Sequence, residues 1–529
     1  MSERTPDVTV VIPVYNTRTY LAACLDSIIS QSIGTDRIEV IAVDDGSTDG
    51  SGELLDQFAA DYPDTVTVVH QANSGGPAEP CNAGLDLARG RFVFFIGSDD
   101  YFGHEALERM VERADALESD VLLCKMVGVN GRKAPDVFEE DVDDVAFPSA
   151  EMAWALSNTK LFRRSLIEDE ELRFPVGMAV CSDVPFTLRA LAKARRISIL
   201  ADYDCYFAVK REGGGNLIYS TGPVEWVDAA ERIVAVVEDL YGPGPDRDAL
   251  VYRVFSREVA KGLQPHFLEA DAAIREKFWE SISGFAQAHL TDAILEQLPT
   301  EKRVRISLAR HRDWQRLEAA IDAAAPGFLV EDGRLFVRYP GFRDGSGLPD
   351  SWYEAATERV LGRLDKGVAP IDLAWAGDRR TGYFLECWFG VPVTGLDAAA
   401  IRVGAVRLEG RRKPAKRAVA QAGEPLDLDL AADVELREDG TTTVVMARLP
   451  LADLHAARTG RWSLRGHLSL GGYTYDLPLK AVNGPVEHYG RPGGLSVTWA
   501  RSRALVVEAD RPTIARRLRR IAKLVLSRK

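Results

Sequence analysis

The stretch that decides the fold runs from residue 92 to residue 102 and reads Phe-Val-Phe-Phe-Ile-Gly-Ser-Asp-Asp-Tyr-Phe. Its first five residues form a continuous apolar run, which predicts a strand buried on both faces. Asp99 and Asp100 follow at its carboxyl end, where open α/β sheets bind their ligands. Two adjacent carboxylates without a neighbouring Lys or Arg repel each other, and a divalent cation relieves that repulsion. The alternative is a solvated turn, in which Asp is common.

Length and composition narrow the class of protein. The 529 residues suffice for three or four domains of about 150 residues each. A net charge of −14 argues against non-specific binding of nucleic acid, so we expect no such partner. The six cysteines form no Cys-x-x-Cys pair, which favours free thiols in a reducing compartment. We find no apolar signal segment at the N-terminus and no run of about 20 apolar residues, and therefore expect a cytoplasmic protein.

Strands and helices alternate along the first hundred residues. Residues 8–14, 38–43 and 66–70 predict strands, and apolar residues at helical spacing follow each of them. The strand that begins at Phe92 completes the series. Because strands that alternate with helices form parallel sheets with right-handed crossovers, we expect an α/β domain with a mostly parallel, Rossmann-like sheet.

Four blocks within this domain resemble family 2 glycosyltransferases. They are Val-Val-Ile-Pro-Val-Tyr-Asn at 10–16, Val-Asp-Asp-Gly-Ser-Thr-Asp at 43–49, Asn-Ser-Gly-Gly-Pro with Asn-Ala-Gly at 73–84, and Ser-Asp-Asp at 98–100. The resemblance extends over residues 6–220. It implies a GT-A fold, in which one α/β domain, here residues 1–222, binds a nucleotide-sugar. The donor is expected to be a UDP-sugar.

The resemblance also implies roles for the carboxylates. Asp45 is expected to accept the N–H of the uracil ring, while Asp99 faces the ribose and shares with Asp100 a Mn²⁺ or Mg²⁺ ion. The residues themselves leave a second interpretation open, because Asp44, Asp45 or Asp49 can cap the following helix. We expect Asp49 to cap and Asp45 to bind.

Other residues are expected around the donor. Pro13 and Tyr15 flank the end of the first strand, where they can shape a base pocket. Asn73 and Gly76 belong to the third block and are also expected to contact the nucleotide-sugar. Lys210 and Arg211 precede a run of glycines, and their charges can screen the leaving diphosphate.

The candidate general base lies further along the domain. Residues 158–166 and 181–186 look like the Lys-Leu-Phe-Arg segment and the base-carrying block of the family, and Asp183 matches the base. Inverting transfer needs one carboxylate that takes the proton from the acceptor hydroxyl. The alternative is that Ser182 or Asp183 only caps the next helix.

Three positions depart from the family pattern. Gly97 stands where another Asp is often found, Cys81 where Arg is common, and Ser182 where Glu precedes the base. Cys81 is expected to be a buried packing thiol rather than a nucleophile. These departures motivate a hypothesis of a different class, namely a catalytically impaired GT-A fold that serves as a scaffold or carbohydrate-binding protein.

The second half of the chain shows other patterns. Residues 223–325 predict a helical linker that is interrupted by Gly-Pro-Gly-Pro at 242–245. Residues 326–510 show period-two alternation and predict a β-sandwich region of one or two units, with hairpin turns at Asp439–Gly440 and Gly471–Gly472.

This order of domains resembles bacterial wall teichoic acid glycosyltransferases, whose C-terminal β domains trimerise or grip polymer. The resemblance implies a cell-envelope polymer such as teichoic acid as the acceptor, with a glycolipid or exopolysaccharide as the alternative. It also implies a homo-oligomer formed through the β region.

Residues 511–529 predict a basic amphipathic helix. Ile514, Leu518, Ile521 and Val525 lie on one helical face, and the seven Lys and Arg residues that follow Pro512 occupy most of the remainder. Such a helix suits peripheral contact with the anionic inner face of the cell membrane. Docking on the acidic body of the protein is an equally good interpretation.

Overall fold

The computed structural model shows two compact units, residues 1–298 with 306–314, and residues 299–305 with 315–529. The structure describes residues 5–134, 140–149, 151–211, 221–323, 327–355, 369–378, 382–407, 428–430, 433–440, 442–450, 460–470, 473–479, 495–499 and 505–509. The predicted helix at 511–529 and the predicted turn at Gly471–Gly472 lie outside these residues. No helix of the described part is long and apolar enough to cross a membrane.

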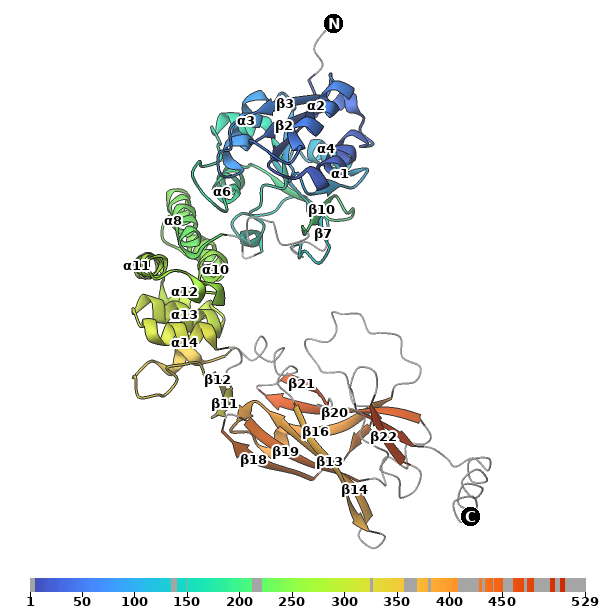
Figure 1. Cartoon of the computed structure of the whole chain (residues 1–529), viewed down its shortest axis with the longest axis vertical. Helices are drawn as coiled ribbons and strands as arrows, with labels where there is room; N and C mark the ends of the chain where they lie inside the picture. The colour runs from blue at the N-terminus through green and yellow to red at the C-terminus, as the bar shows by residue number, and fades with distance from the viewer. Residues whose placement is uncertain are drawn as a thin grey trace, which may run out of the picture. The chain divides into compact units, whose positions relative to one another are not determined.

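A seven-stranded sheet forms the centre of the N-terminal domain, with the order β3-β2-β1-β4-β8-β6-β9 (Figure 1). All neighbouring strands are parallel except β8, which runs antiparallel to β4 and β6. The mostly parallel α/β sheet is therefore confirmed. The strands are β1 Val8–Val14, β2 Ile38–Asp44, β3 Val66–His70, β4 Phe92–Phe95, β6 Val121–Cys124, β8 Lys160–Arg163 and β9 Ile197–Leu200.

A smaller sheet lies beside the carboxyl end of β4. Its order is β5-β10-β7, where β5 is Tyr101–Phe102, β10 is Tyr206–Val209 and β7 is Met126–Val129. The helices of the domain are α1 Arg18–Ile29, α2 Ser51–Asp61, α3 Ala78–Leu87, α4 Ala106–Ala116, α5 Arg164–Asp169 and α6 Asp183–Lys193, with short 3₁₀ turns at Thr35–Arg37 and Met152–Trp154.

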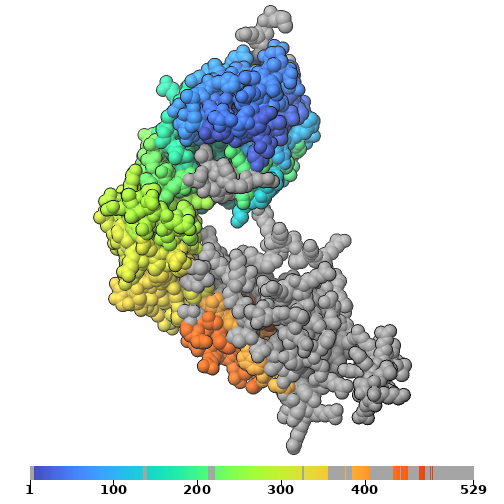
Figure 2. Space-filling view, in the orientation of Figure 1, coloured from blue at the N-terminus to red at the C-terminus, as the bar shows by residue number. Residues whose placement is uncertain are grey.

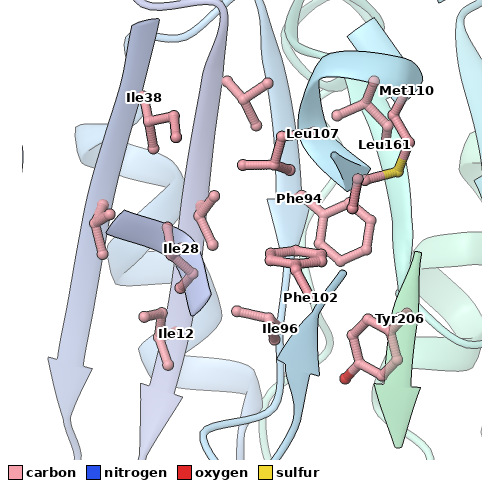
Figure 3. Close-up of a cluster of buried hydrophobic side chains, with 14 of the residues drawn as sticks. Ile12, Ile28, Ile38, Phe94, Ile96, Phe102, Leu107, Met110, Leu161 and Tyr206 are labelled. Atoms are coloured by element: carbon pink, nitrogen blue, oxygen red, sulfur yellow. The ribbon is translucent and has the colours of Figure 1, made fainter. Parts of the chain in front are cut away.

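The core explains why the apolar run at residue 92 organises the domain. All four residues of β4 are buried, and Phe94 packs edge-on against Phe102 with ring centroids 4.9 Å apart. Figure 3 shows Phe94 and Phe102 among the aliphatic side chains of β1, β2, α1 and α4. Tyr206 closes the cluster, and its hydroxyl points out of it. Burial on both faces therefore holds β4, and the carboxylates that follow it, in a rigid setting.

Helix α3 approaches β1 so closely that only glycine fits at residue 84. A Cβ there would lie 2.4 Å from Cγ1 of Val11. Overpacking a core at such a contact costs about 1–3 kcal/mol, so we expect Gly84→Ala to lower the free energy of unfolding by that amount in urea denaturation. Gly284→Ala is the matched control, because a Cβ at that position in a helix meets no atom within 4 Å and should stabilise by about 1 kcal/mol. Equal effects of the two changes would contradict the close packing.

Helices follow the N-terminal domain, as predicted. They are α8 Pro223–Leu240, α9 Pro245–Val254, a π-helical turn Phe255–Val259, α10 Ala260–Gly262, a 3₁₀ turn Pro265–Glu269, α11 Ala272–His289, α12 Asp292–Gln297, α13 Thr300–Arg310 and α14 Trp314–Asp322. The Gly-Pro-Gly-Pro interruption separates α8 from α9, and Pro245 is the first residue of α9. In Figure 2 the green surface of this region continues directly from that of the N-terminal domain, in keeping with the contact of α8 with α6.

The described residues beyond 326 form sheets, which confirms the predicted all-β region. The first sheet has the order β12-β11-β15, the second β13-β14-β19-β18, and the third β17-β16-β20-β23-β22 with β21 paired to β20. Asp439 pairs with Thr442, as expected for a hairpin turn at Gly440. The elements are β11 Phe328–Glu331, β12 Arg334–Val337, α15 Asp350–Tyr353, β13 Ala369–Asp378, β14 Gly382–Val391, β15 Val393–Thr394, a 3₁₀ turn Ala398–Ala400, β16 Ile401–Arg407, β17 Leu428–Leu430, β18 Asp433–Asp439, β19 Thr442–Pro450, β20 Gly460–Leu470, β21 Tyr473–Pro478, β22 Leu495–Trp499 and β23 Leu505–Ala509.

Candidate active site

The predicted site residues gather where the parallel strands β1, β2 and β4 end. Tyr15 follows β1, Asp45 follows β2, and Asp99 and Asp100 follow β4. Strand β8 runs the other way, and its Leu161 pairs with Phe94, so Lys160 lies at the same edge of the sheet. Parallel strands present their carboxyl ends on one side, which explains why residues more than a hundred positions apart share this edge.

Asp45 is buried, and its carboxylate holds the loop that follows β3. Oδ1 accepts hydrogen bonds from Gln71 Nε2 at 2.6 Å and from the Ser74 backbone N–H at 3.0 Å, and Oδ2 accepts one from Ser74 Oγ at 2.9 Å. Asn73 donates to the backbone carbonyl of Asp45 at 3.0 Å. A carboxylate has about four lone-pair positions, so most of this one serves the loop. The contacts of Asp45 and Asn73 therefore fix the loop after β3, which forms a wall of the site.

The loops after β1 and β2 are also joined to each other. Asn16 accepts the Thr48 backbone N–H at 2.8 Å, and its own N–H donates to Ser47 Oγ at 3.0 Å. Pro13 is partly buried within β1, whereas Tyr15 is 49% exposed. An exposed ring on a fixed loop can stack on a planar base.

The prediction that Asp49 caps α2 is wrong in detail, because Gly50 occupies the N-cap position. Asp49 nevertheless accepts backbone N–H groups at the starts of two helices. Its Oδ1 binds Ser51 at 3.0 Å and its Oδ2 binds Arg18 at 2.9 Å. The carboxylate thus ties the starts of α1 and α2 together beside Asp45.

Asp44 is held by a histidine that the sequence did not single out. His70 Nδ1 lies 2.9 Å from Asp44 Oδ2, and its Nε2 lies 3.0 Å from Asp56 Oδ1. These two contacts, that with Asp56 first, raise the pKa of His70. When it is protonated, the ring can donate to both carboxylates.

This bridge predicts a pH-dependent contribution to stability. Because the pKa of His70 is higher in the folded state, its contribution is complete below the pKa of an unfolded histidine, about 6.5, and is lost as the pH rises through the folded pKa. We expect His70→Gln to lower the free energy of unfolding by about 1 kcal/mol or less at pH 5.5, since the pair is partly exposed, and by less at pH 9. Urea denaturation at both pH values measures this, and a deficit that does not change with pH would contradict the bridge.

Asp100 is anchored inside the protein. Its Oδ2 accepts the Tyr206 hydroxyl at 2.5 Å, and its Oδ1 accepts the Val209 backbone N–H at 2.7 Å and Arg132 Nη1 at 3.3 Å. Burial, followed by the charge of Asp99, raises the pKa of Asp100 to about 6. Asp100 therefore joins the loop after β4 to β10.

Asp99 has a different setting. Its Oδ2 accepts Arg211 Nε at 2.7 Å, and its side chain is 9% exposed. Lys210, the residue before Arg211, is exposed. The two cations predicted to screen a diphosphate thus follow β10, and one of them contacts a carboxylate of the strand-β4 loop.

Gly97 gains a physical explanation from these carboxylates. A Cβ at this position would lie 3.0 Å from Asp99 Oδ1 and 3.0 Å from Asp100 Oδ2. Both carboxylates therefore turn toward the backbone of residue 97, and an Asp side chain there would push against both. Glycine at residue 97, where the family often has Asp, therefore suits the positions of the Asp99 and Asp100 carboxylates.

The donor atoms at Asp99 and Asp100 suit a hard divalent cation. Carboxylate oxygens are the ligands of Mg²⁺ and similar ions, which often use one or two carboxylates and complete their shell with phosphates of the substrate. No cluster of three or more His, Cys, Asp or Glu side chains in the described part of the chain is placed to hold a metal alone. The carboxylates of Asp99 and Asp100 fit an ion held jointly with a diphosphate.

Asp183 is the first residue of α6 and is partly exposed. Ser182 occupies the N-cap position, but its side chain makes no capping hydrogen bond. Loss of water raises the pKa of Asp183, and the nearby cations Arg257, Arg253 and Lys160 oppose this rise. Burial in turn lowers the pKa of Lys160 to about 8. A carboxylate with a raised pKa is a better proton acceptor.

Cys81 lies close enough to Asp183 for that charge to raise its pKa, although burial raises it more. The thiol is buried, as predicted. A high pKa leaves almost no thiolate at neutral pH, which argues against a nucleophile. Its position on α3 shows that Asp183 faces the first turns of that helix.

Aromatic packing joins the element that carries Asp183 to the strand that leads to Asp99. Phe186 of α6 stacks on Phe174 with ring centroids 4.2 Å apart, and both rings meet Phe95 of β4 edge-on at 5.5 and 4.9 Å. The Asn82 side chain binds both the N–H and the carbonyl of Phe174, each at 2.9 Å. Gly76 lies beside this loop, because a Cβ there would be in ordinary van der Waals contact with the Met178 carbonyl oxygen, at 3.4 Å.

Several residues that position the site were not predicted from the sequence. Gln71 and Ser74 hydrogen-bond Asp45, and Tyr206 and Arg132 hydrogen-bond Asp100. Arg253 and Arg257 of the linker lie near Asp183, and so does Lys160 of the N-terminal domain. A polar residue after β3 and a tyrosine in an apolar strand are weak signals by themselves. Their partners become visible only when the strands are side by side.

Two family models match the chain. Residues 9–178 match "Glycosyl transferase family 2", and residues 223–321 match "Glycosyl transferase TarS linker domain". The chain is 37% identical over 344 residues to a poly(ribitol-phosphate) beta-glucosyltransferase of Bacillus spizizenii, and 29% identical over 336 residues to the poly(ribitol-phosphate) beta-N-acetylglucosaminyltransferase TarS of Staphylococcus aureus. These matches cover 63% and 62% of this chain, and they span 53% and 58% of the relatives' own length.

Solved structures of TarS resemble the fold. TarS residues 1–349 in complex with UDP-GlcNAc align with a TM-score of 0.57 at 28% identity, over 66% of this chain and 99% of that chain. A longer TarS structure aligns with a TM-score of 0.59 over 96% of this chain and 86% of that chain. Because the sequence identity is only 20%, this match shows similarity of fold alone.

Proposed function

Since residues 9–178 form a glycosyl transferase family 2 domain, we propose that the protein transfers a sugar from a UDP-sugar to a hydroxyl group of a polyol-phosphate polymer of the cell envelope. The observation that carries the proposal is the gathering at one edge of the sheet of an exposed aromatic ring, a pair of carboxylates and a separate carboxylate of raised pKa. The names of the relatives support ribitol-phosphate polymer as acceptor and glucose or N-acetylglucosamine as the sugar. The likeness to TarS bound to UDP-GlcNAc supports the donor class.

The chain's own residues supply donor binding. Tyr15 stacks on the uracil, and the wall formed by Asp45, Asn73 and Gly76 borders the base and ribose. Arg211 exchanges its contact with Asp99 for the diphosphate, which it and Lys210 screen. A divalent cation bound by Asp99 and Asp100 would supply Lewis-acid stabilisation of the charge on the departing UDP.

Asp183 carries the proton transfer. The acceptor hydroxyl donates its proton to the carboxylate as its oxygen forms a bond to the anomeric carbon, while the bond from that carbon to the phosphate oxygen breaks. A single displacement of this kind inverts the anomeric configuration. Arg257, Arg253 and Lys160 oppose the rise in the pKa of Asp183 that its loss of water causes.

The test is transfer from UDP-glucose and UDP-GlcNAc to a synthetic ribitol-phosphate oligomer in the presence of Mn²⁺. We expect one of the two donors to give a glycosylated oligomer and stoichiometric UDP, with NMR showing an anomeric configuration opposite to that of the donor. UDP binding without transfer or hydrolysis of either donor would favour the scaffold hypothesis. Transfer with retention would contradict the role of Asp183.

A further inference from the structure

The linker places a fully buried ion pair next to the N-terminal domain. Arg253, in the last turn of α9, lies 2.8 Å from Glu258 in the π-helical turn that follows, and the two side chains are 1% and 0% exposed. None of the guanidinium nitrogens of Arg253 makes a hydrogen bond of good geometry. Burying two charges is costly, and breaking such a pair is more costly still. π-Helical turns are frequent at functional sites.

This pair reaches the segment that begins α6. Sγ of Cys181 lies 3.9 Å from Oε1 of Glu258. Cys181 has a φ of +60°, which is unusual for a residue with a side chain, and its carbonyl accepts the Val184 N–H at 3.1 Å. The contact with Glu258 therefore falls on a strained residue two positions before Asp183. Glu258, a side chain of the linker, therefore contacts the segment that positions the candidate base Asp183.

We propose that the Arg253–Glu258 pair is a positioning element for Asp183, so that the linker completes the active site of the N-terminal domain. The inference rests on the proposed function, because it takes Asp183 as the base. Glu258 holds Cys181 in the conformation that starts α6, while Arg253 neutralises Glu258 and adds positive potential at the base.

Several charged and titratable groups lie near Asp183, which is partly exposed. They are Cys81 of α3, Lys160 of β8, Cys181 of the preceding loop, Arg253 of α9 and, from the π-helical turn, Arg257 together with Glu258. Arg257 and Arg253 lower the pKa of Asp183 against the effect of burial. Removal of a positive charge should therefore raise this pKa, and removal of the negative charge of Glu258 should lower it.

The test compares Arg253→Met, Glu258→Gln and the double variant Arg253→Met/Glu258→Met with the wild-type full chain. We expect kcat for transfer to fall by about tenfold or more, because a small displacement of a catalytic group has effects of that size or larger, with the Kd for UDP unchanged. The acidic limb of the kcat–pH profile should move to higher pH in Arg253→Met and to lower pH in Glu258→Gln. General damage to the fold would not shift the limb in opposite directions.

If the single variants fail to fold, the double variant still tests the inference, because removing both charges together leaves no buried unpaired ion. A double variant that folds, binds UDP and retains the wild-type kcat would overturn the inference. The matched control is Arg247→Met/Glu238→Met, which removes a partly exposed linker pair with a 2.7 Å contact and should leave kcat and the pH profile unchanged. If Asp183→Asn is inactive while the pair variants behave as wild type, this inference alone fails. If Asp183→Asn remains active, the proposed function fails with it.

Discussion

Asp183→Asn is expected to lower the rate of sugar transfer by about 10²–10⁴-fold, the contribution that a positioned general base makes. The amide keeps the size of the side chain but cannot take the proton of the acceptor hydroxyl. Donor binding should be unchanged, because the residues proposed to bind the nucleotide lie on or follow strands of the two sheets and none of them lies on α6. Single-turnover transfer from UDP-GlcNAc or UDP-glucose measures the rate, and calorimetry with UDP measures binding.

The same variant should be at least as stable as the wild type at neutral pH. A carboxyl group whose pKa is raised in the folded state contributes stability at low pH, and loses it as the pH rises through the folded pKa. Above the folded pKa the ionised carboxylate of Asp183 is therefore less favourable in the folded state than in the unfolded state, and Asn removes that charge. Asp61→Asn, an exposed change at the end of α2, is the control and should alter neither activity nor Tm. A variant that loses activity and stability together would instead indicate a structural role for Asp183.

Asp99→Asn is expected to have the second largest effect, a fall in transfer of about 10²–10³-fold that comes with a weaker response to Mn²⁺. Asp99 forms an ion pair with Arg211, which is proposed to move to the diphosphate when the donor binds. Loss of the Asp99 carboxylate should therefore change metal and diphosphate binding without unfolding the domain. Chelation of divalent ions should abolish wild-type transfer, and Mn²⁺ should restore it. Titration of activity with Mn²⁺ in both proteins provides the measurement.

Asp100→Asn is the informative comparison. Because Asp100 accepts hydrogen bonds from Tyr206, Val209 and Arg132 inside the protein, the change should lower Tm as well as activity. An Asp99→Asn protein with wild-type activity, or wild-type transfer in the presence of chelator, would contradict the prediction that transfer needs a divalent cation.

The sequence alone predicted the elements that local patterns specify. Period and burial identify β1, β2, β3 and β4, and the carboxyl ends of parallel strands predict that Tyr15, Asp45 and Asp99 share one edge. Partners that come from distant segments could not be predicted this way. Tyr206 meets Asp100 across 106 residues, and Gln71 meets Asp45 across the gap between neighbouring strands.

The linker shows the same limit. Its apolar spacing correctly predicted helices, yet that pattern assigns Arg253 and Glu258 to ordinary polar positions. Only the packing of α9 and the π-helical turn near α6 reveals that both charges are buried beside the candidate base. The family motifs seen in the sequence end before the linker, so they did not single out Arg253 or Glu258.

The most direct test of one shared active site is a crystal structure of the full chain with UDP and Mn²⁺. We expect the uracil against Tyr15 and the loop held by Asp45, and the ion between Asp99 and the diphosphate. The β-phosphate, to which the sugar is attached in the donor, should then point toward Asp183. UDP bound at another edge of the sheet, or with its diphosphate directed away from Asp183, would contradict the account.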